Sequence, residues 1–228
     1  MICPPEGGGL CTDGAEAYLP GMSGGWFEQR AFRRLEIRGP EGARSVIEDA
    51  GYLERLVARI EAIDADGPMR KKIGPNPRVI ELIFEPAPQR KPEVHEIING
   101  MLKTPSNGFH RGRYPAVEEI VSEIESLLAP ALGKTLPLVV GTPLKLDGFE
   151  ITYRGKTHEE HAPATLQTNT AKFDVASARG IETLRVVSGQ LPPRPLHFAV
   201  AGTEYVLFTY ESPAGRRLYP RAFVVDRA

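Results

Sequence analysis

The stretch LHFAVAGTEYVLFTYESPAGRRLYPRAFVVD, residues 196–226, decides the fold class of this chain. It holds three apolar or alternating runs of the kind that form β-strands, and short turn signals separate them. The turns are Gly202-Thr203 and Ser212-Pro213-Ala214-Gly215. The pattern predicts an antiparallel three-stranded meander with strands over 197–201, 204–210 and 217–225.

The middle run of the meander is nearly continuous in apolar character at residues 205–208, which is typical of a strand covered on both faces. Pro220 inside the last run indicates an edge position or a bulge. Upstream of the meander the chain carries four further strand patterns, and Asp147-Gly148 between two of them is a strong hairpin signal. These strands are predicted over 136–140, 144–146, 149–154 and 181–187.

The part before Pro130 differs, because helical spacing of apolar residues predominates there. The spacing predicts helices over 41–63, 92–103 and 115–129, with strands over 32–38 and 78–85. We therefore predict an α+β protein with a helical N-terminal half and a C-terminal antiparallel sheet. The predicted organisation is a flexible Gly/Pro-rich leader (1–25), a helical subdomain (26–132) and a β subdomain (133–228), the last two possibly forming one continuous domain.

Composition narrows the class of protein. The 228 residues are 41% hydrophobic and 25% charged, as in ordinary globular proteins, and the net charge of −1 is not that of a nucleic-acid coat protein. No apolar run reaches the roughly 18 residues of a membrane helix, and the start lacks the pattern of a secretory signal. Cys3 and Cys11 are too few for a disulfide framework or a tetrahedral zinc site, and whether they pair stays open. We expect a soluble, cytoplasmic protein without membrane contact or cofactor.

Basic residues gather in two loops that the predicted topology brings together. If strand 78–85 is followed by an antiparallel helix over 92–103, loops 64–78 and 103–114 lie at one end of the fold. The second loop also leads into the N-terminus of helix 115–129, which favours anions. This basic pole suits an acidic partner surface, a phosphate or a nucleic-acid backbone. Its predicted binding residues are Arg70, Lys71, Lys72, Arg78, Lys103, Arg111, Arg113 and Tyr114.

Histidines supply two further candidates. His158 and His161 flank two glutamates, but only two residues separate them, and a metalloprotease helix needs three, so we expect a polar loop and no metal site. His110 is the best catalytic candidate, because Arg111 and Arg113 beside it would stabilise developing negative charge.

Two classes of function remain. The first is an interaction or accessory protein of the inhibitor, immunity or adaptor type, as found in bacteria, which binds a protein partner through the basic pole or a sheet edge. The alternative is a metal-independent phosphodiesterase or ribonuclease that uses His110 with Arg111 and Arg113. No phosphate-binding glycine loop, dinucleotide fingerprint or nucleophile elbow is present in the sequence. The binding protein is therefore the preferred hypothesis.

Overall fold

The structure is a computed structural model that describes residues 26–63, 75–103, 109–110, 115–161, 166–189, 191–218 and 220–228. The predicted leader and most of the two basic loops lie outside these residues. The described chain is mostly β, with 48% of residues in strands and 17% in helices. The prediction of a helical N-terminal half is therefore wrong.

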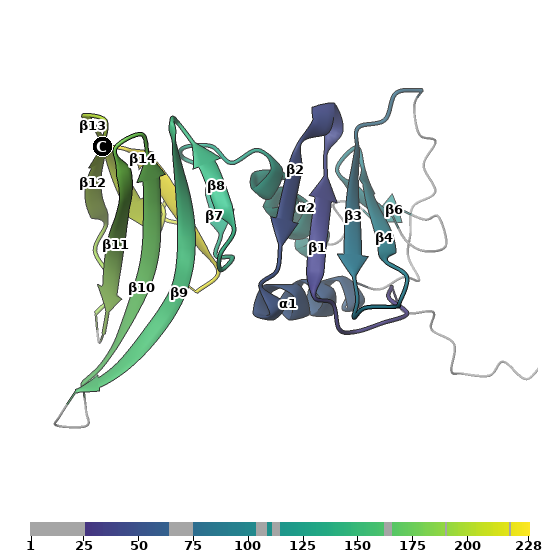
Figure 1. Cartoon of the computed structure of the whole chain (residues 1–228), viewed down its shortest axis with the longest axis horizontal. Coiled ribbons are helices and arrows are strands. Elements are labelled where there is room, and N and C mark those ends of the chain that lie inside the picture. Colours follow the sequence, from purple (N-terminus) through teal and green to yellow (C-terminus); the bar gives the residue numbers. More distant parts are fainter. Residues whose placement is uncertain are drawn as a thin grey trace, which may run out of the picture.

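The N-terminal half is a six-stranded antiparallel sheet with two helices on one face (Figure 1). The order across the sheet is β2-β1-β3-β4-β5-β6. A short 3₁₀ turn, Pro40–Gly42, joins the first two strands in the chain. The bounds are β1 Arg34–Arg38, β2 Arg44–Ile47, β3 Val79–Glu85, β4 Glu93–Ile98, β5 Met101–Lys103 and β6 Phe109–His110, with helices α1 Ala50–Glu61 and α2 Pro115–Leu128.

The helix predicted over 92–103 is instead the β4–β5 hairpin. Asn99 and Gly100 form its turn, both with positive φ (51° and 73°), which is the backbone that this dipeptide adopts in two-residue hairpins. Within β4, His95 and Ile97 are buried while the adjacent Val94 is 56% exposed, so burial follows the period of a strand. Pairing with β3 overrides the helical spacing.

The long helix predicted over 41–63 is likewise split into β2 and α1. Asp49 lies between them in an extended conformation, and its side chain accepts a hydrogen bond from the Tyr52 backbone N–H (3.1 Å), so it is the N-cap of α1. The predicted helix over 115–129 and the predicted strands over 32–38 and 78–85 are confirmed in α2, β1 and β3. Inward-facing residues of these elements, including Leu35, Leu82 and Ile124, form one buried core.

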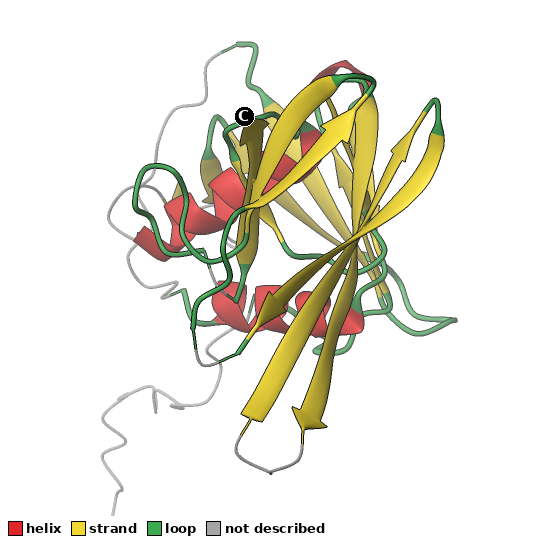
Figure 2. Cartoon of the chain, turned by 90° about the vertical axis from the view of Figure 1, so that its left-hand side faces the viewer, coloured by secondary structure: helices red, strands yellow, loops and turns green. Residues whose placement is uncertain are grey.

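The C-terminal half is a β-sandwich of two four-stranded antiparallel sheets, β11-β10-β9-β8 and β12-β13-β14-β7 (Figures 1 and 2). Aromatic side chains join the sheets, since Phe149 contacts Tyr205 (ring centroids 5.0 Å apart) and Phe173 contacts Phe223 (5.2 Å). The bounds are β7 Thr135–Pro137, β8 Pro143–Leu146, β9 Phe149–His161, β10 Leu166–Ser177, β11 Gly180–Ser188, β12 Leu196–Val200, β13 Thr203–Phe208 and β14 Ala222–Arg227.

The meander is confirmed as β12, β13 and β14, and β13 is covered on both faces as predicted, since Tyr205, Val206 and Leu207 are all buried. Its last strand begins later than predicted, at Ala222, because a turn precedes it, in which the Ser212 N–H donates to the Arg216 carbonyl (2.9 Å) and Glu211 pairs with Arg217 in an isolated bridge. Pro220 therefore precedes the strand instead of interrupting it. The sheet also gains β7, which pairs with β14.

The two halves contact each other directly. The Val140 backbone N–H, just after β7, donates to the Asp49 carboxylate (2.9 Å), so the N-cap of α1 also holds the second half. Within the N-terminal half, Gly39 lies close to Leu128 of α2, where an added Cβ would stand 3.0 Å from the leucine methyl group and would displace it. Whether the halves are separate domains stays a prediction. Neither described helix is long and apolar enough to cross a membrane.

Candidate functional site

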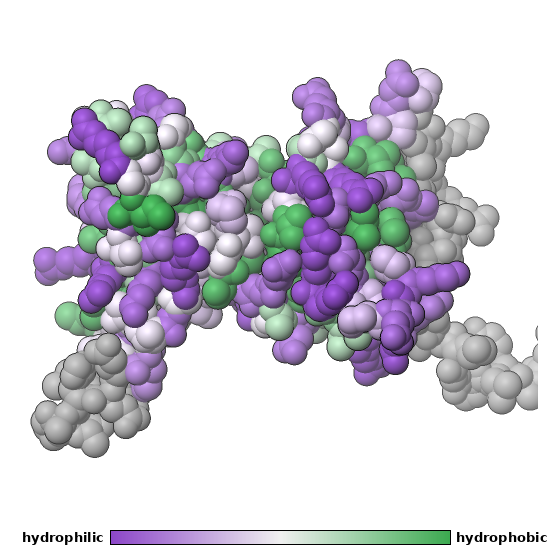
Figure 3. Space-filling view, in the orientation of Figure 1, coloured by the Kyte–Doolittle hydropathy of each residue, from purple (hydrophilic) through white to green (hydrophobic). Residues whose placement is uncertain are grey.

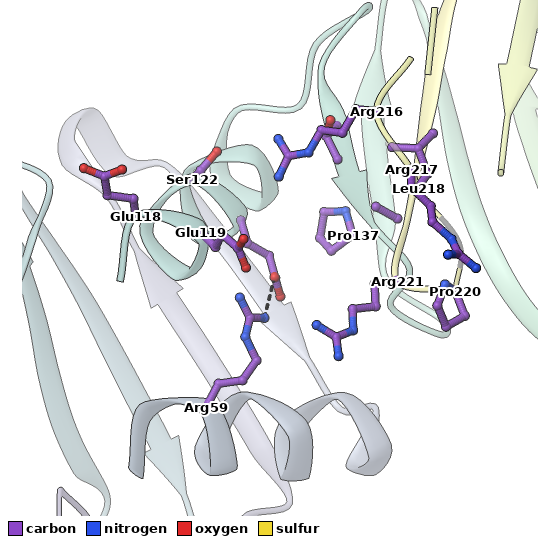
Figure 4. Close-up of a pocket in the computed structure, with 13 residues that line it drawn as sticks. Arg59, Glu118, Glu119, Ser122, Pro137, Arg216, Arg217, Leu218, Pro220 and Arg221 are labelled. Atoms are coloured by element: carbon purple, nitrogen blue, oxygen red, sulfur yellow. Dashed lines mark hydrogen bonds and ion pairs between the residues drawn. The ribbon is translucent and has the colours of Figure 1, made fainter. Parts of the chain in front are cut away.

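A cleft of about 790 Å³ opens where the two halves meet (Figure 4). Helices α1 and α2 form one side, β7 forms the floor, and the segment leading into β14 forms the other side. Its lining contains four arginines and three glutamates, with few apolar side chains. The lining residues are Arg59, Glu118, Glu119, Ser122, Glu123, Thr135, Pro137, Arg216, Arg217, Leu218, Pro220, Arg221 and Ala222.

The helical side of the cleft is acidic. The apolar residues of α2, such as Val117 and Ile120, face the core, which turns Glu119 and Ser122 outward. In Figure 4, Glu119 points into the cleft and Glu118 lies at its outer rim. Both glutamates are exposed, and neither forms an ion pair with any described residue. They therefore present uncompensated negative charge.

The opposite side is basic, and its backbone is firmly held. Leu218 is buried, its N–H donates to the Tyr210 carbonyl (2.8 Å), and its carbonyl accepts from the N–H of Arg221 (3.0 Å). The Ser212 turn fixes Arg216, whose N–H donates to the Ser212 hydroxyl oxygen (3.0 Å). These contacts fix the backbone that carries both arginines before any ligand arrives, which lowers the entropic cost of binding.

The arginines of this side differ in direction. Arg216 and Arg221 extend across the cleft toward the helical side, whereas Arg217 turns away (Figure 4). Arg217 lies over the ring of Tyr210, with 5.8 Å from the guanidinium carbon to the ring centroid. Arg216 and Arg221 are exposed and form no ion pair among the described residues. Their guanidinium groups are available to a carboxylate or phosphate.

The back of the cleft contains a paired charge. Arg59 of α1 donates to Glu123 of α2 (Nη1 to Oε2, 2.6 Å), and both side chains are largely buried. The hydroxyl of Tyr52 is buried nearby and meets no hydrogen-bond partner in good geometry among the described residues. Burial and the negative charge of Glu123 raise the pKa of Tyr52 well above its usual range, so this hydroxyl stays protonated.

The predicted basic pole is only partly within the described structure. The topological argument for it fails, because the helix over 92–103 does not exist. Arg78 pairs with Glu125 of α2 (3.5 Å), and Lys103 pairs with Glu96 on the neighbouring strand, so both charges are compensated. The side chains of the other predicted residues lie outside the described part: Arg70, Lys71, Lys72, His110, Arg111, Arg113 and Tyr114.

The histidine motif at 158–161 lies in β9 and not in the expected loop. His158 contacts the side chain of Asn169 on β10 (3.1 Å). The side chain of His161 is outside the described residues. Among the residues that the structure describes, no group of three His, Cys, Asp or Glu side chains could hold a metal ion.

The cleft was not predicted from the sequence, because the pattern there places Arg217 and Arg221 in a strand over 217–225. The signal was present, since Arg216, Arg217 and Arg221 are three arginines within six residues without an acidic neighbour. No known protein family matches the sequence, and no curated protein and no solved structure is significantly similar to the chain. The function therefore has to be argued from the cleft.

The described lining of the cleft offers charged groups and two hydroxyl groups. Ser122 and Thr135 are its hydroxyl groups, and none of the described lining residues is a histidine that could activate them. Opposed charges on two walls hold a ligand that carries both signs, one toward each wall. A uniformly anionic chain such as a nucleic acid would meet Glu118 and Glu119 as well as the arginines.

Proposed function

We propose that this protein is an interaction protein whose cleft binds a segment of a partner protein that carries both acidic and basic side chains. The observation that supports the proposal is that the two facing walls carry opposite charges without ion-pair partners among the described residues. Arg216 and Arg221 lie on one side, and Glu119 lies on the other. Acidic side chains of the partner pair with the two arginines, and a basic side chain pairs with Glu119. We further propose that the protein acts in the cytoplasm, as expected from the sequence.

A polypeptide segment fits this cleft better than an apolar small molecule does. Ligand pockets for such molecules are lined mainly by apolar and aromatic side chains. Here the apolar lining consists of prolines, one alanine and Leu218, while charged groups form both walls. The ribonuclease alternative with His110, Arg111 and Arg113 stays a prediction, because those side chains lie outside the described residues.

A random-peptide phage library selected on the full chain tests the proposal. We expect selected peptides to combine Asp or Glu with Lys or Arg at a fixed spacing. The double variant Arg216→Glu/Arg221→Glu should bind them at least roughly tenfold more weakly, since each charge-assisted hydrogen bond contributes about 1.5–3 kcal/mol. Affinity should also fall with added salt, because both walls are exposed to solvent.

The matched control is Arg30→Glu/Arg179→Glu, which makes the same change in net charge at exposed arginines outside the cleft. This variant should bind the selected peptides like the wild type. Equal loss of binding in both double variants would show that only net charge matters. Selection of peptides without acidic residues would also contradict the proposal.

A further inference from the structure

β11 is an open sheet edge that differs from the other edges of the described sheets. It is nine residues long and pairs with β10 on one side only. The opposite edge of the same sheet, β8, has four residues, among them Pro143 and Lys145, and both types discourage further pairing. The sequence of β11, GIETLRVVS, contains neither proline nor lysine. The other edge strands of the described sheets have only two to five residues, so β11 is the edge best suited to receive another strand.

Exposed apolar side chains concentrate at this edge. Five large hydrophobic residues are exposed in the described part of the chain, and three of them belong to β11 and the loop after it. They are Ile181 (70% exposed), Val187 (57%) and Leu191 (80%). Figure 3 shows hydrophobic surface over this region, among hydrophilic side chains. Leu184 and Val186 alternate with them and face the sandwich core, so Ile181 and Val187 lie on the outer face.

The spacing of these residues is self-complementary. In a continuous antiparallel sheet, a strand that pairs with its own copy about residue k places residue i opposite residue 2k − i, on the same face. With Leu184 at the centre, Ile181 lies opposite Val187 of the second copy, and the pair occurs twice. The same register places Thr183 opposite Arg185. A two-fold axis at Glu182 or at Arg185 would instead place that charged residue directly opposite its own copy.

Charge favours the same register. Arg185 lies opposite Lys172 of β10 within one chain, which is an unfavourable like-charge pair, and neither forms an ion pair among the described residues. On the next outer row, Asp174 lies opposite Thr183, accepts its hydroxyl hydrogen bond (2.7 Å) and pairs with Arg154 (2.6 Å). When the copies pair about Leu184, Arg185 of the second copy lies two strands away from Asp174. The distance between their Cα atoms is then roughly 10 Å. That separation is within reach of an arginine side chain.

Space for the second strand exists beside β11. A groove of about 580 Å³ runs between residues 185–187 and the segment 191–196 that leads into β12. The side of the molecule that carries β11 and β12 faces the viewer in Figure 2. A strand that pairs with β11 would enter this groove and cover Val187 and Leu191.

From this register we propose that the protein forms a two-fold symmetric dimer through β11, with Leu184 of each copy at the axis. The two sheets that contain β11 become one eight-stranded sheet, joined by backbone hydrogen bonds and by the two Ile181–Val187 pairs. This inference is independent of the proposed function, because the cleft and the β11 edge share no residue.

Sedimentation velocity on the full chain tests the dimer. The chain has a mass of 25.0 kDa, so the wild type should sediment as a species of twice that mass at micromolar concentration. Val187→Lys should weaken the dimer by roughly tenfold or more, because the change disrupts two cross-strand apolar pairs. The control is Val94→Lys, which introduces the same change at a valine of nearly equal exposure (56%) in the other half. That variant should remain dimeric.

Disulfide trapping tests the register. In a background with Cys3→Ser and Cys11→Ser, an equimolar mixture of Ile181→Cys and Val187→Cys chains should form a cross-linked heterodimer under mild oxidation. Each variant alone should cross-link far less, because in this register position 181 of one copy faces position 187 of the other, and two introduced thiols at the same position stand too far apart to bond. A monomeric wild type, equal weakening by Val187→Lys and Val94→Lys, or equal cross-linking of the single variants would each overturn the proposal.

Discussion

Acidification should destabilise the fold through one buried histidine, His95 of β4. This residue is 7% exposed, and its ring packs against Phe27 (ring centroids 4.4 Å apart) and Phe84 (5.7 Å). Removal from water disfavours the charged imidazolium and lowers the pKa of His95 from 6.5 to about 4. The aromatic pocket thus requires a neutral ring.

The sign and size of the effect follow from linkage. Above pH 6.5 the ring is neutral in the folded and unfolded chains, and its burial carries no protonation penalty. Between pH 6.5 and about 4 the unfolded chain binds a proton that the folded chain does not, so stability falls as the pH falls. At about pH 5 the loss is about 2 kcal/mol, and below pH 4 it approaches about 3 kcal/mol.

Thermal unfolding followed by circular dichroism measures this loss. For a chain of this length, 2 kcal/mol lowers Tm by about 4–8 °C between neutral pH and pH 5. His95→Leu should remove that part of the pH dependence, since leucine binds no proton. His197→Leu, at a histidine of β12 that is far less buried, is the matched control and should retain it. Identical pH profiles for the wild type and His95→Leu, or an NMR titration of His95 near pH 6.5, would refute the reasoning.

Two further predictions concern the elements that position the cleft. Asp49→Ala removes the N-cap of α1 and the hydrogen bond to Val140, and it should lower the free energy of unfolding by about 1–2 kcal/mol, as measured by thermal unfolding. Asp49→Asn should retain most of the capping. Equal losses of stability in both variants would contradict the capping role. Leu218→Ala should cost at least about 2 kcal/mol and weaken binding of the selected peptides, because the buried Leu218 side chain anchors the segment whose backbone carbonyl accepts from Arg221. Unchanged peptide binding at a temperature where the variant is fully folded would show that Arg221 does not depend on this anchor.

Local sequence signals predicted those elements whose residue pattern is compatible with only one type of secondary structure. Asp147-Gly148 lies between β8 and β9, and Ser212 to Gly215 form a turn, with Gly215 at a positive φ of 74°. In α2 the apolar stripe is uninterrupted and begins at a proline, so helix was the only consistent interpretation. These signals act within a few residues, and no distant contact was needed to interpret them.

The predictions for the N-terminal half were wrong where the apolar residues fit both the period of a helix and the period of a strand. Ile97, Ile98, Met101 and Leu102 satisfy the spacing of a helix, but they equally form two short strands about a turn. Asn99-Gly100 between them is the feature that decides, and it outweighs the apolar spacing because both residues adopt left-handed backbone. β10 was missed for another reason. Its sequence, LQTNTAKFDVAS, contains no long apolar run, and it becomes a strand through pairing with β9 and β11 on both sides.

The cleft depends on one strand register that local sequence does not encode. A six-residue link, 129–134, joins α2 to β7, and β7 pairs with β14 so that Pro137 lies opposite Ala222 and Thr135 opposite Val224. Because β14 begins at Ala222, the residue before it lies beside the residue that follows β7, and the Leu138 N–H donates to the Arg221 carbonyl (2.9 Å). A shift of one residue in this register would reverse the faces of β14 and bury Ala222 and Asp226 in place of Phe223 and Val225. Burial of Phe223 and Val225 against the opposite sheet therefore fixes where Arg221 stands, and the facing of the two charged walls is a consequence of core packing.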